Sequence, residues 1–110
     1  MSSTTPLREP TFHILAALAA EDAHGYRLIK AVEELSEGRI VLRAGTLYGA
    51  LARLEADGQV EAVGTSQAGG PARRTYRLTT QGRNLLAAEL RRLEANVAMA
   101  RSQLGRAAEA

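Results

Sequence analysis

The stretch from residue 43 to residue 58 constrains the fold of this chain more than any other. Leu47, Leu51 and Leu54 recur at helical spacing and direct one side of a helix toward a core. The other side carries mostly glycine, alanine and threonine, with arginine at each end and no acidic residue before Glu55. A chain built around this helix has to bury the leucines and leave a small, basic face free.

This second face suits a helix that enters a DNA groove. The small side chains of Thr46, Gly49 and Ala50 let the backbone approach another large molecule closely. Arg43 and Arg53 can reach anionic groups, and the free N–H groups at a helix start favour a phosphate. An alanine-rich helix with two solvated arginines is the alternative that this stretch alone leaves open.

Length and composition limit the remaining possibilities. The 110 residues suffice for one small domain with an added helix, and the low aromatic content of 4% leads us to expect stabilisation by oligomerisation. Thirteen of the fourteen basic residues are arginine, which suits phosphate and guanine edges, although a GC-rich genome also enriches arginine. The lack of cysteine fits a reducing compartment. The apolar run 14–20 is too short for a signal or a membrane span, so we expect a cytoplasmic protein without membrane contact.

The order of the expected elements defines the fold class. Apolar periodicity predicts helices over 11–20 and 26–35, and residues 40–42 form a short run typical of a strand. Gly58 is placed to end the third helix as a left-handed cap. Residues 59–63 and 75–78 then predict a hairpin with a long, mobile, basic tip, which has Arg73 and Arg74 at its exit. Three helices and such a hairpin predict a winged helix-turn-helix, whose third helix lies in the major groove while the wing follows the phosphates.

The last segment predicts a dimerisation helix. It begins at Thr79, a plausible N-cap, and is expected to be helical to about residue 104. Its apolar residues alternate four and three apart, which defines a heptad stripe of Leu86, Leu90, Leu93, Val97, Ala100 and Leu104. Glu94 and Arg101 occupy e-type flanks, and Glu89 a g-type flank. The stripe predicts a homodimer, with packing on its own domain as the alternative.

The fold is therefore expected to be mainly α with a small β-hairpin. A flexible N-terminus (1–6) precedes the winged helix-turn-helix domain (7–78). The dimerisation helix (79–105) and a frayed tail (106–110) follow it.

The tyrosines are expected in the core or at the DNA, and the histidines are expected to have no catalytic or metal-binding role. We expect the Tyr48 hydroxyl to reach a phosphate oxygen, with a half-buried tyrosine bracing the wing as the alternative. Tyr26 and Tyr76 are expected in the core. His13 and His24 lie on different elements without any cysteine, so no metal site is predicted. No nucleophile motif accompanies them, and we expect neither an enzyme nor a cofactor.

Several fragments, in this order and spacing, resemble the PadR family of transcriptional regulators. The matching pieces are Thr11-Phe12-His13-Ile14-Leu15, His24-Gly25-Tyr26-Arg27-Leu28-Ile29, Gly45-Thr46-Leu47-Tyr48, Leu51-Ala52-Arg53-Leu54-Glu55 and Arg74-Thr75-Tyr76-Arg77-Leu78-Thr79. The resemblance runs from residue 7 to about residue 99. With its single C-terminal helix, the chain is similar to the short branch of the family. It implies a homodimeric winged-helix repressor that binds an inverted repeat, with release by a small molecule in some members.

Two residues depart from the family pattern. Arg43 stands where the family commonly has serine, so a hydroxyl cap is lost and we expect a phosphate contact in its place. Gly49 stands where proline is common, and it loosens the first turn by roughly 1 kcal/mol relative to alanine.

Two functions from different classes follow. The first is a sequence-specific regulator that contacts double-stranded DNA through Arg43, Thr46, Tyr48, Arg53, Arg73 and Arg74. The second is a winged-helix module for protein contact that does not bind DNA. A small-molecule effector is left open: Phe12, Leu86, Leu90 and Leu93 line either a cavity for an apolar ligand or a closed core.

Overall fold

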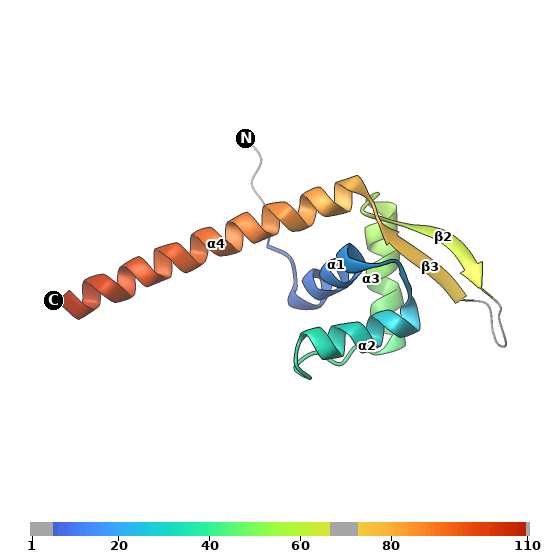
Figure 1. The fold of residues 1–110 in the computed structure, drawn as a ribbon, viewed down its shortest axis with the longest axis horizontal. Helices are drawn as coiled ribbons and strands as arrows, with labels where there is room; N and C mark the ends of the chain where they lie inside the picture. The colour runs from blue at the N-terminus through green and yellow to red at the C-terminus, as the bar shows by residue number, and fades with distance from the viewer. Residues whose placement is uncertain (1–5, 67–72, 110) are drawn as a thin grey trace.

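The computed structural model describes residues 6–66 and 73–109. Three helices and a small sheet form a body from which a fourth, long helix projects (Figure 1). The elements follow in the order α1 (Glu9–Ala20), β1 (Ala23–His24), α2 (Gly25–Leu35), α3 (Ala44–Ala56), β2 (Val60–Ser66), β3 (Arg73–Leu78) and α4 (Thr80–Glu109). The projecting helix makes the molecule long, with extents of 64 × 34 × 21 Å.

The first helix begins slightly earlier than expected. Pro10 lies in its first turn, where a missing N–H costs no hydrogen bond, so α1 already starts at Glu9. Ile14, Leu15 and Leu18 are buried on this helix. They pack with α2, α3 and the sheet into a single aliphatic core.

The segment between α1 and α2 contains the two-residue strand β1, where only a break between helices was expected. Ala23 pairs with Tyr76 and His24 pairs with Thr75, both in antiparallel register. His24 is also the N-cap of α2, because its Nδ1 accepts a hydrogen bond from the backbone N–H of Arg27 at 3.1 Å. Two residues are too short for any periodicity, so this strand depends on its pairing with β3.

The strand expected at residues 40–42 is wrong. This segment is an irregular connection that leads into α3. The Ile40 N–H donates to Ser36 Oγ at 2.9 Å, and Leu42 enters the core while Val41 stays exposed. An apolar run forms a strand only beside a free sheet edge, and here the run anchors a loop to the core instead.

The third helix buries its leucines as expected. Leu47, Leu51 and Leu54 are in the core. Ala50 is buried as well, so its expected place on the outer face is wrong. Gly58 has a φ of 75°, and the Gln59 N–H donates to the Leu54 carbonyl at 2.8 Å. The left-handed cap expected at Gly58 is therefore confirmed.

The sheet has three antiparallel strands in the order β1-β3-β2. Val60 pairs with Leu78 and Ser66 with Arg73, with an irregularity between Ala62 and Gly64. The expected hairpin is confirmed, and both strands reach farther toward its tip than expected. The mobile tip proposed from the sequence falls on residues 67–72, which lie outside the described residues.

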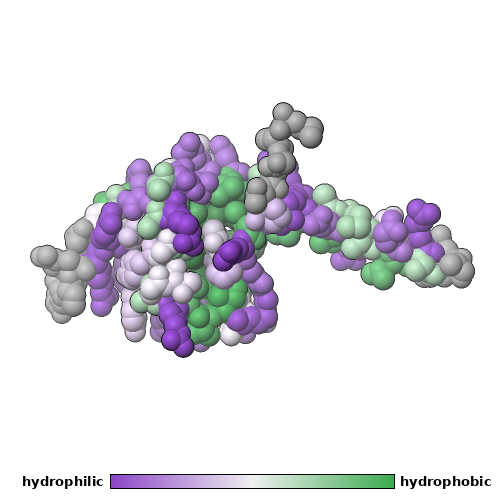
Figure 2. Space-filling view, turned by 180° about the vertical axis from the view of Figure 1, so that it is seen from behind, coloured by the Kyte–Doolittle hydropathy of each residue, from purple (hydrophilic) through white to green (hydrophobic). Residues whose placement is uncertain are grey.

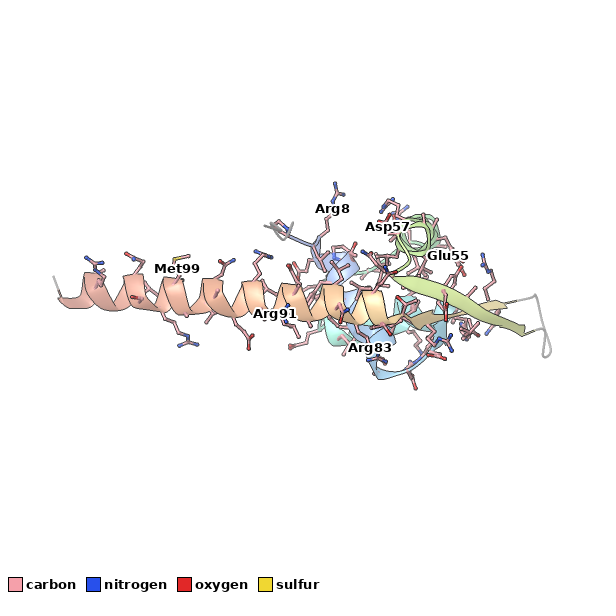
Figure 3. All side chains as sticks on the ribbon, turned by 90° about the horizontal axis from the view of Figure 1, so that it is seen from above. Arg8, Glu55, Asp57, Arg83, Arg91 and Met99 are labelled. Carbon is pink, nitrogen blue, oxygen red and sulfur yellow. The ribbon has the colours of Figure 1, made fainter. Side chains whose placement is uncertain are left out.

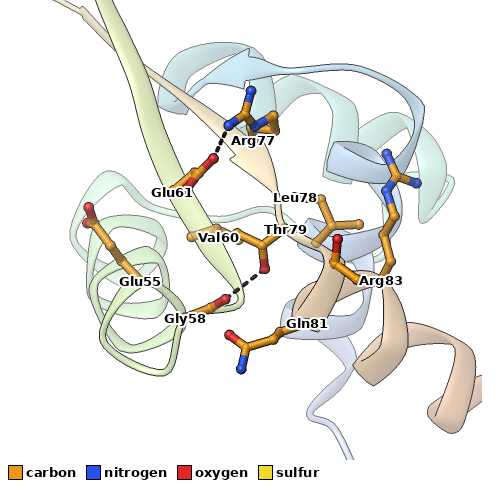
Figure 4. A pocket seen from close by; sticks show the side chains of 10 residues that line it. Glu55, Gly58, Val60, Glu61, Arg77, Leu78, Thr79, Gln81 and Arg83 are labelled. Carbon is orange, nitrogen blue, oxygen red and sulfur yellow. Dashed lines mark hydrogen bonds and ion pairs between the residues drawn. The ribbon is translucent and has the colours of Figure 1, made fainter.

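Thr79 joins the ends of two helices. Its Oγ1 accepts a hydrogen bond from the Gly82 N–H at 3.1 Å and donates one to the Gly58 carbonyl at 2.7 Å (Figure 4). The N-cap expected at Thr79 is confirmed, and α4 is tied to the end of α3. The frayed tail expected from residue 106 is instead helical as far as Glu109.

The order helix, strand, helix, helix, strand, strand is that of a winged helix-turn-helix. The expected fold class is therefore confirmed. In this arrangement α2 and α3 are the two helices of the helix-turn-helix, and β2 and β3 form the wing.

Candidate nucleic-acid interface

The outer face of α3 is shallow and open. It is formed by Gly45, Thr46, Gly49, Ala52 and Arg53, which are exposed or partly exposed. A Cβ added at Gly45 would meet nothing within 4 Å, and one at Gly49 would meet only the Arg53 guanidinium, at 3.8 Å. Glycine lowers helix stability by about 1 kcal/mol relative to alanine, yet packing within the protein requires neither residue. The face therefore has room for a close approach, and in Figure 2 it is the pale surface bordered by hydrophilic side chains.

Basic and polar groups surround the start of this helix. Arg43 is the N-cap residue of α3, and its side chain makes no capping bond. The loss of a hydroxyl cap expected at Arg43 is thus confirmed, and the first-turn N–H groups have no acceptor from that side chain. Arg43 and Thr46 are both exposed. An exposed arginine beside uncapped helical N–H groups is a favourable place for an anion.

Tyr48 lies on the flank of α3 that faces α2. Its side chain is half exposed, at 49%, and its phenol ring packs directly over Gly25, the first residue of α2. A Cβ at Gly25 would overlap this ring. Tyr48 therefore contacts the start of α2 as well as solvent, and it lines a pocket together with Arg73, Arg74 and Tyr76 of the wing. Both the phosphate contact and the alternative of bracing the wing stay predictions.

The core position expected for Tyr26 is wrong, whereas that for Tyr76 is confirmed. Tyr26 is 66% exposed and the Arg73 guanidinium lies 5.8 Å from its ring centroid, while Tyr76 is buried. The helical spacing contained this information, because Tyr26 is two residues from the buried Leu28 and so lies on the opposite side of α2. The pocket beside it has a volume of about 460 Å³ and is lined by His24, Gly25, Tyr26, Tyr48, Arg73, Arg74 and Tyr76.

The two arginines of the wing have different surroundings. Arg74 donates from Nη2 to Glu55 Oε2 on α3 at 3.2 Å, and its guanidinium lies 5.5 Å from the Tyr76 ring centroid. Arg73 stacks on Tyr26, and no carboxylate of the described residues pairs with it. Of these two wing arginines, Arg73 is therefore the one whose charge is not compensated by a carboxylate of the described residues.

The heptad stripe of α4 divides into two parts. Leu86 packs against the domain core and Leu93 is partly buried. Leu90, Val97, Ala100 and Leu104 are exposed along the projecting part of the helix. Figure 3 shows α4 extending far past the body, with Met99 standing free on the projecting part. The single chain therefore leaves most of the stripe uncovered.

Glu89 does not flank the stripe in solvent, as expected for a g-type position. It is 2% exposed and pairs with Arg92, and it also accepts a hydrogen bond from the Leu7 N–H at 3.2 Å. The helical pattern could not reveal this role because Leu7 is far away in the chain. The Arg92 guanidinium holds the pKa of the Glu89 carboxyl below its usual range.

A hollow lies between α1 and α4, close to where an effector cavity was considered. It has a volume of about 430 Å³ and is lined by Leu7, Glu9, Phe12, His13, Arg39, Glu89, Arg92 and Leu93. Phe12 and Leu93 are in the expected lining, whereas Leu86 and Leu90 are not. The lining therefore combines the apolar side chains of Leu7, Phe12 and Leu93 with charged residues.

Neither a metal-binding cluster nor a membrane-spanning helix is present over residues 6–66 and 73–109. No group of three or more histidine, aspartate or glutamate side chains lies close enough to hold a metal ion there. None of the helices in these ranges combines the length and apolar character needed to cross a membrane.

Comparison with known proteins identifies the family. The sequence model of the transcriptional regulator PadR-like family matches residues 14–88, which is most of the chain. The chain belongs to the PadR-like family. It is 41% identical over 93 residues to the transcriptional regulator Rv3488 of Mycobacterium tuberculosis, an alignment that covers 84% of this chain and 80% of the relative.

Solved PadR structures share the fold. A PadR family transcription regulator from Clostridium difficile superimposes with a TM-score of 0.73 at 24% identity, over 88% of this chain and 99% of that one. Bacillus subtilis PadR, solved in complex with operator DNA, superimposes with a TM-score of 0.67 at 23% identity, over 76% of this chain and 48% of that one. The resemblance inferred from the sequence is confirmed. This PadR-like chain is a transcriptional regulator and not an enzyme, because its family consists of transcriptional regulators.

Proposed function

We propose that this PadR-like regulator is a homodimeric, sequence-specific DNA-binding repressor. The observation that carries the proposal is the outer face of α3, where the unobstructed Gly45 and Gly49 lie between Arg43 and Arg53. A helix of this kind enters the major groove, and its arginines contact phosphates or guanine edges. Arg73 on the wing and the half-exposed Tyr48 extend the same interface along the backbone.

The heptad stripe supports a dimer. An uncovered apolar stripe on a helix of thirty residues is stabilised by a second copy of the same helix. In the dimer, the two α3 helices enter successive major grooves about 34 Å apart, so the operator is an inverted repeat with that spacing. The relative from Bacillus subtilis, which was solved with operator DNA, supports a DNA target for this fold.

Repression fits a dimer that occupies a promoter, and a small-molecule effector would act by changing the dimer geometry. The hollow between α1 and α4 is a place where such a ligand could bind. A regulator of this kind works beside the chromosome, which agrees with the cytoplasmic location expected from the sequence.

The deciding experiment measures binding to the promoter region of the protein's own gene by fluorescence anisotropy, with excess random DNA as competitor. We expect one fragment to be retained and its affinity to fall with salt. Arg73→Gln should flatten the salt dependence by about one unit for each lost phosphate contact per subunit. Arg91→Gln, which removes the same charge from an exposed position on α4 (Figure 3), is the control and should leave the slope unchanged.

Equal binding to all fragments would contradict sequence specificity. Failure to bind any DNA would favour the protein-contact module, with the outer face of α3 as its docking surface.

A further inference from the structure

Arg74 is held from two sides. Its Nη2 donates to Glu55 Oε2 at 3.2 Å, and its guanidinium lies 5.5 Å from the ring centroid of the buried Tyr76. The carboxylate comes from α3 and the ring from β3. Arg74 therefore connects the wing to the helix whose outer face carries the proposed DNA contacts.

Glu55 places a negative charge on the helix whose outer face carries the proposed DNA contacts. A carboxylate on α3 repels the phosphates of any DNA that approaches it, and it also compensates the charge of a wing arginine. Both effects lower the affinity for DNA of any sequence, because non-specific binding depends on cations that displace counterions from phosphates. Any function of Glu55 in DNA recognition must therefore lie in something other than affinity.

Fixing the wing is that function. The pair spans nineteen positions of the chain and links β3 to α3 across the turn at Gly58. A wing in a fixed position relative to α3 helps only the DNA sequence whose groove and backbone match both elements. A wing whose Arg74 is not paired with Glu55 adapts to the phosphate backbone of DNA of any sequence.

We propose that Glu55 is a specificity-determining positioning residue: by pairing with Arg74 it fixes the wing against α3 and withholds Arg74 from non-specific phosphate contacts. This inference rests on the proposed DNA-binding function. The two wing arginines then have different roles: Arg73 contacts phosphate, and Arg74 fixes the position of the wing relative to α3.

The test compares the wild type with Glu55→Gln, Arg74→Gln and the double variant. Affinities for the operator fragment and for a random duplex of equal length are measured by fluorescence anisotropy from about 50 to 200 mM salt. In Glu55→Gln, the freed Arg74 should raise the affinity for random DNA about tenfold at low salt and steepen the slope by about two units per dimer. The ratio of operator to random affinity should fall by a similar factor.

The double variant separates charge from geometry. It removes both charges, so its salt slope should return to that of the wild type, while the operator preference stays low. Arg74→Gln alone should also lose operator preference, and it should not flatten the slope as Arg73→Gln does.

Glu61→Gln is the matched control. Glu61 on β2 pairs with Arg77 on β3, nearer the base of the hairpin (Figure 4), and this pair has an exposure similar to that of Glu55 and Arg74. Loss of this second pair should leave the operator preference unchanged. Any small rise in random binding that it causes gives the baseline for removing one carboxylate from the domain.

The outcomes are distinguishable. If the wild type binds no DNA, the proposed function fails and the inference fails with it. If the wild type prefers its operator, but Glu55→Gln has unchanged random affinity or loses operator and random binding equally, the inference alone is overturned. Equal losses would mean that Glu55 only supports the fold.

Discussion

Glu89 and Arg92, one turn apart on α4, form a bidentate ion pair in which Arg92 Nε and Nη2 donate to the two carboxylate oxygens at 2.8 and 2.6 Å. The same carboxylate accepts the Leu7 N–H, so the segment before α1 is attached to α4. The Glu89 carboxylate therefore joins the segment before α1 to α4, whose projecting part carries the proposed dimer interface.

The first prediction concerns acid stability. The hydrogen bond from Arg92, and then the one from Leu7, lower the pKa of Glu89 in the folded protein against the opposing effect of desolvation. The contribution to stability is complete above the ordinary glutamate value of 4.5 and is lost as pH falls below it toward the folded pKa. Glu89→Gln should lower the urea midpoint at pH 7, and its difference from the wild type should shrink at acid pH. Glu94→Gln, an exposed carboxylate on the same helix, should change neither.

The second prediction concerns the dimer. Val97 is 51% exposed on the heptad stripe, and Met99 is 56% exposed on another side of α4. Val97→Glu would place a charge between two apolar helices and should weaken dimerisation at least about a hundredfold. Met99→Glu should leave the dimer intact. Light scattering coupled to gel filtration measures both, and identical masses for the two variants would contradict the stripe as the interface.

The third prediction uses two unobstructed glycines in helices. A Cβ at Gly45 on α3 or at Gly105 on α4 meets nothing within 4 Å. Each alanine variant should therefore raise the free energy of unfolding by up to about 1 kcal/mol. Only Gly45→Ala should weaken operator binding, by about tenfold, because its methyl group would occupy the space where DNA approaches. A melting curve and an anisotropy titration on each variant decide this, and unimpaired operator binding by Gly45→Ala would count against the outer face of α3.

The fourth prediction concerns the junction of the wing and α4. A Cβ at Gly82 would overlap the Gln59 carbonyl oxygen and the Leu78 side chain. A backbone oxygen cannot turn away, so Gly82→Ala should lower the free energy of unfolding by about 1–3 kcal/mol or more. Urea unfolding measures the loss, with Gly105→Ala as the reference. A Gly82→Ala variant as stable as the wild type would mean that this junction relaxes easily.

Three features of the structure differ from the sequence-based predictions, and each difference has a physical cause. Residues 40–42 have the composition of a strand, but strand formation also needs a partner edge, which no local pattern encodes. The core position expected for Tyr26 rests on its place at the start of the second helix, although its spacing from Leu28 puts it on the opposite side of α2. Glu89 has a regular position beside the heptad stripe, and its burial depends on Leu7 at the other end of the chain.

The sequence by itself determined the features that depend on neighbours within a few residues. These are the buried leucines of α3, the left-handed cap at Gly58 and the N-cap at Thr79, because helix periodicity and capping are local interactions. Only the tertiary structure decided which charges remain free. Arg73 and Arg74 are adjacent in the chain, yet one stacks on Tyr26 while the other is compensated by Glu55 on α3. The physical reason is that successive residues of a strand point to opposite faces, so the partners of each are set by the elements that packing brings alongside.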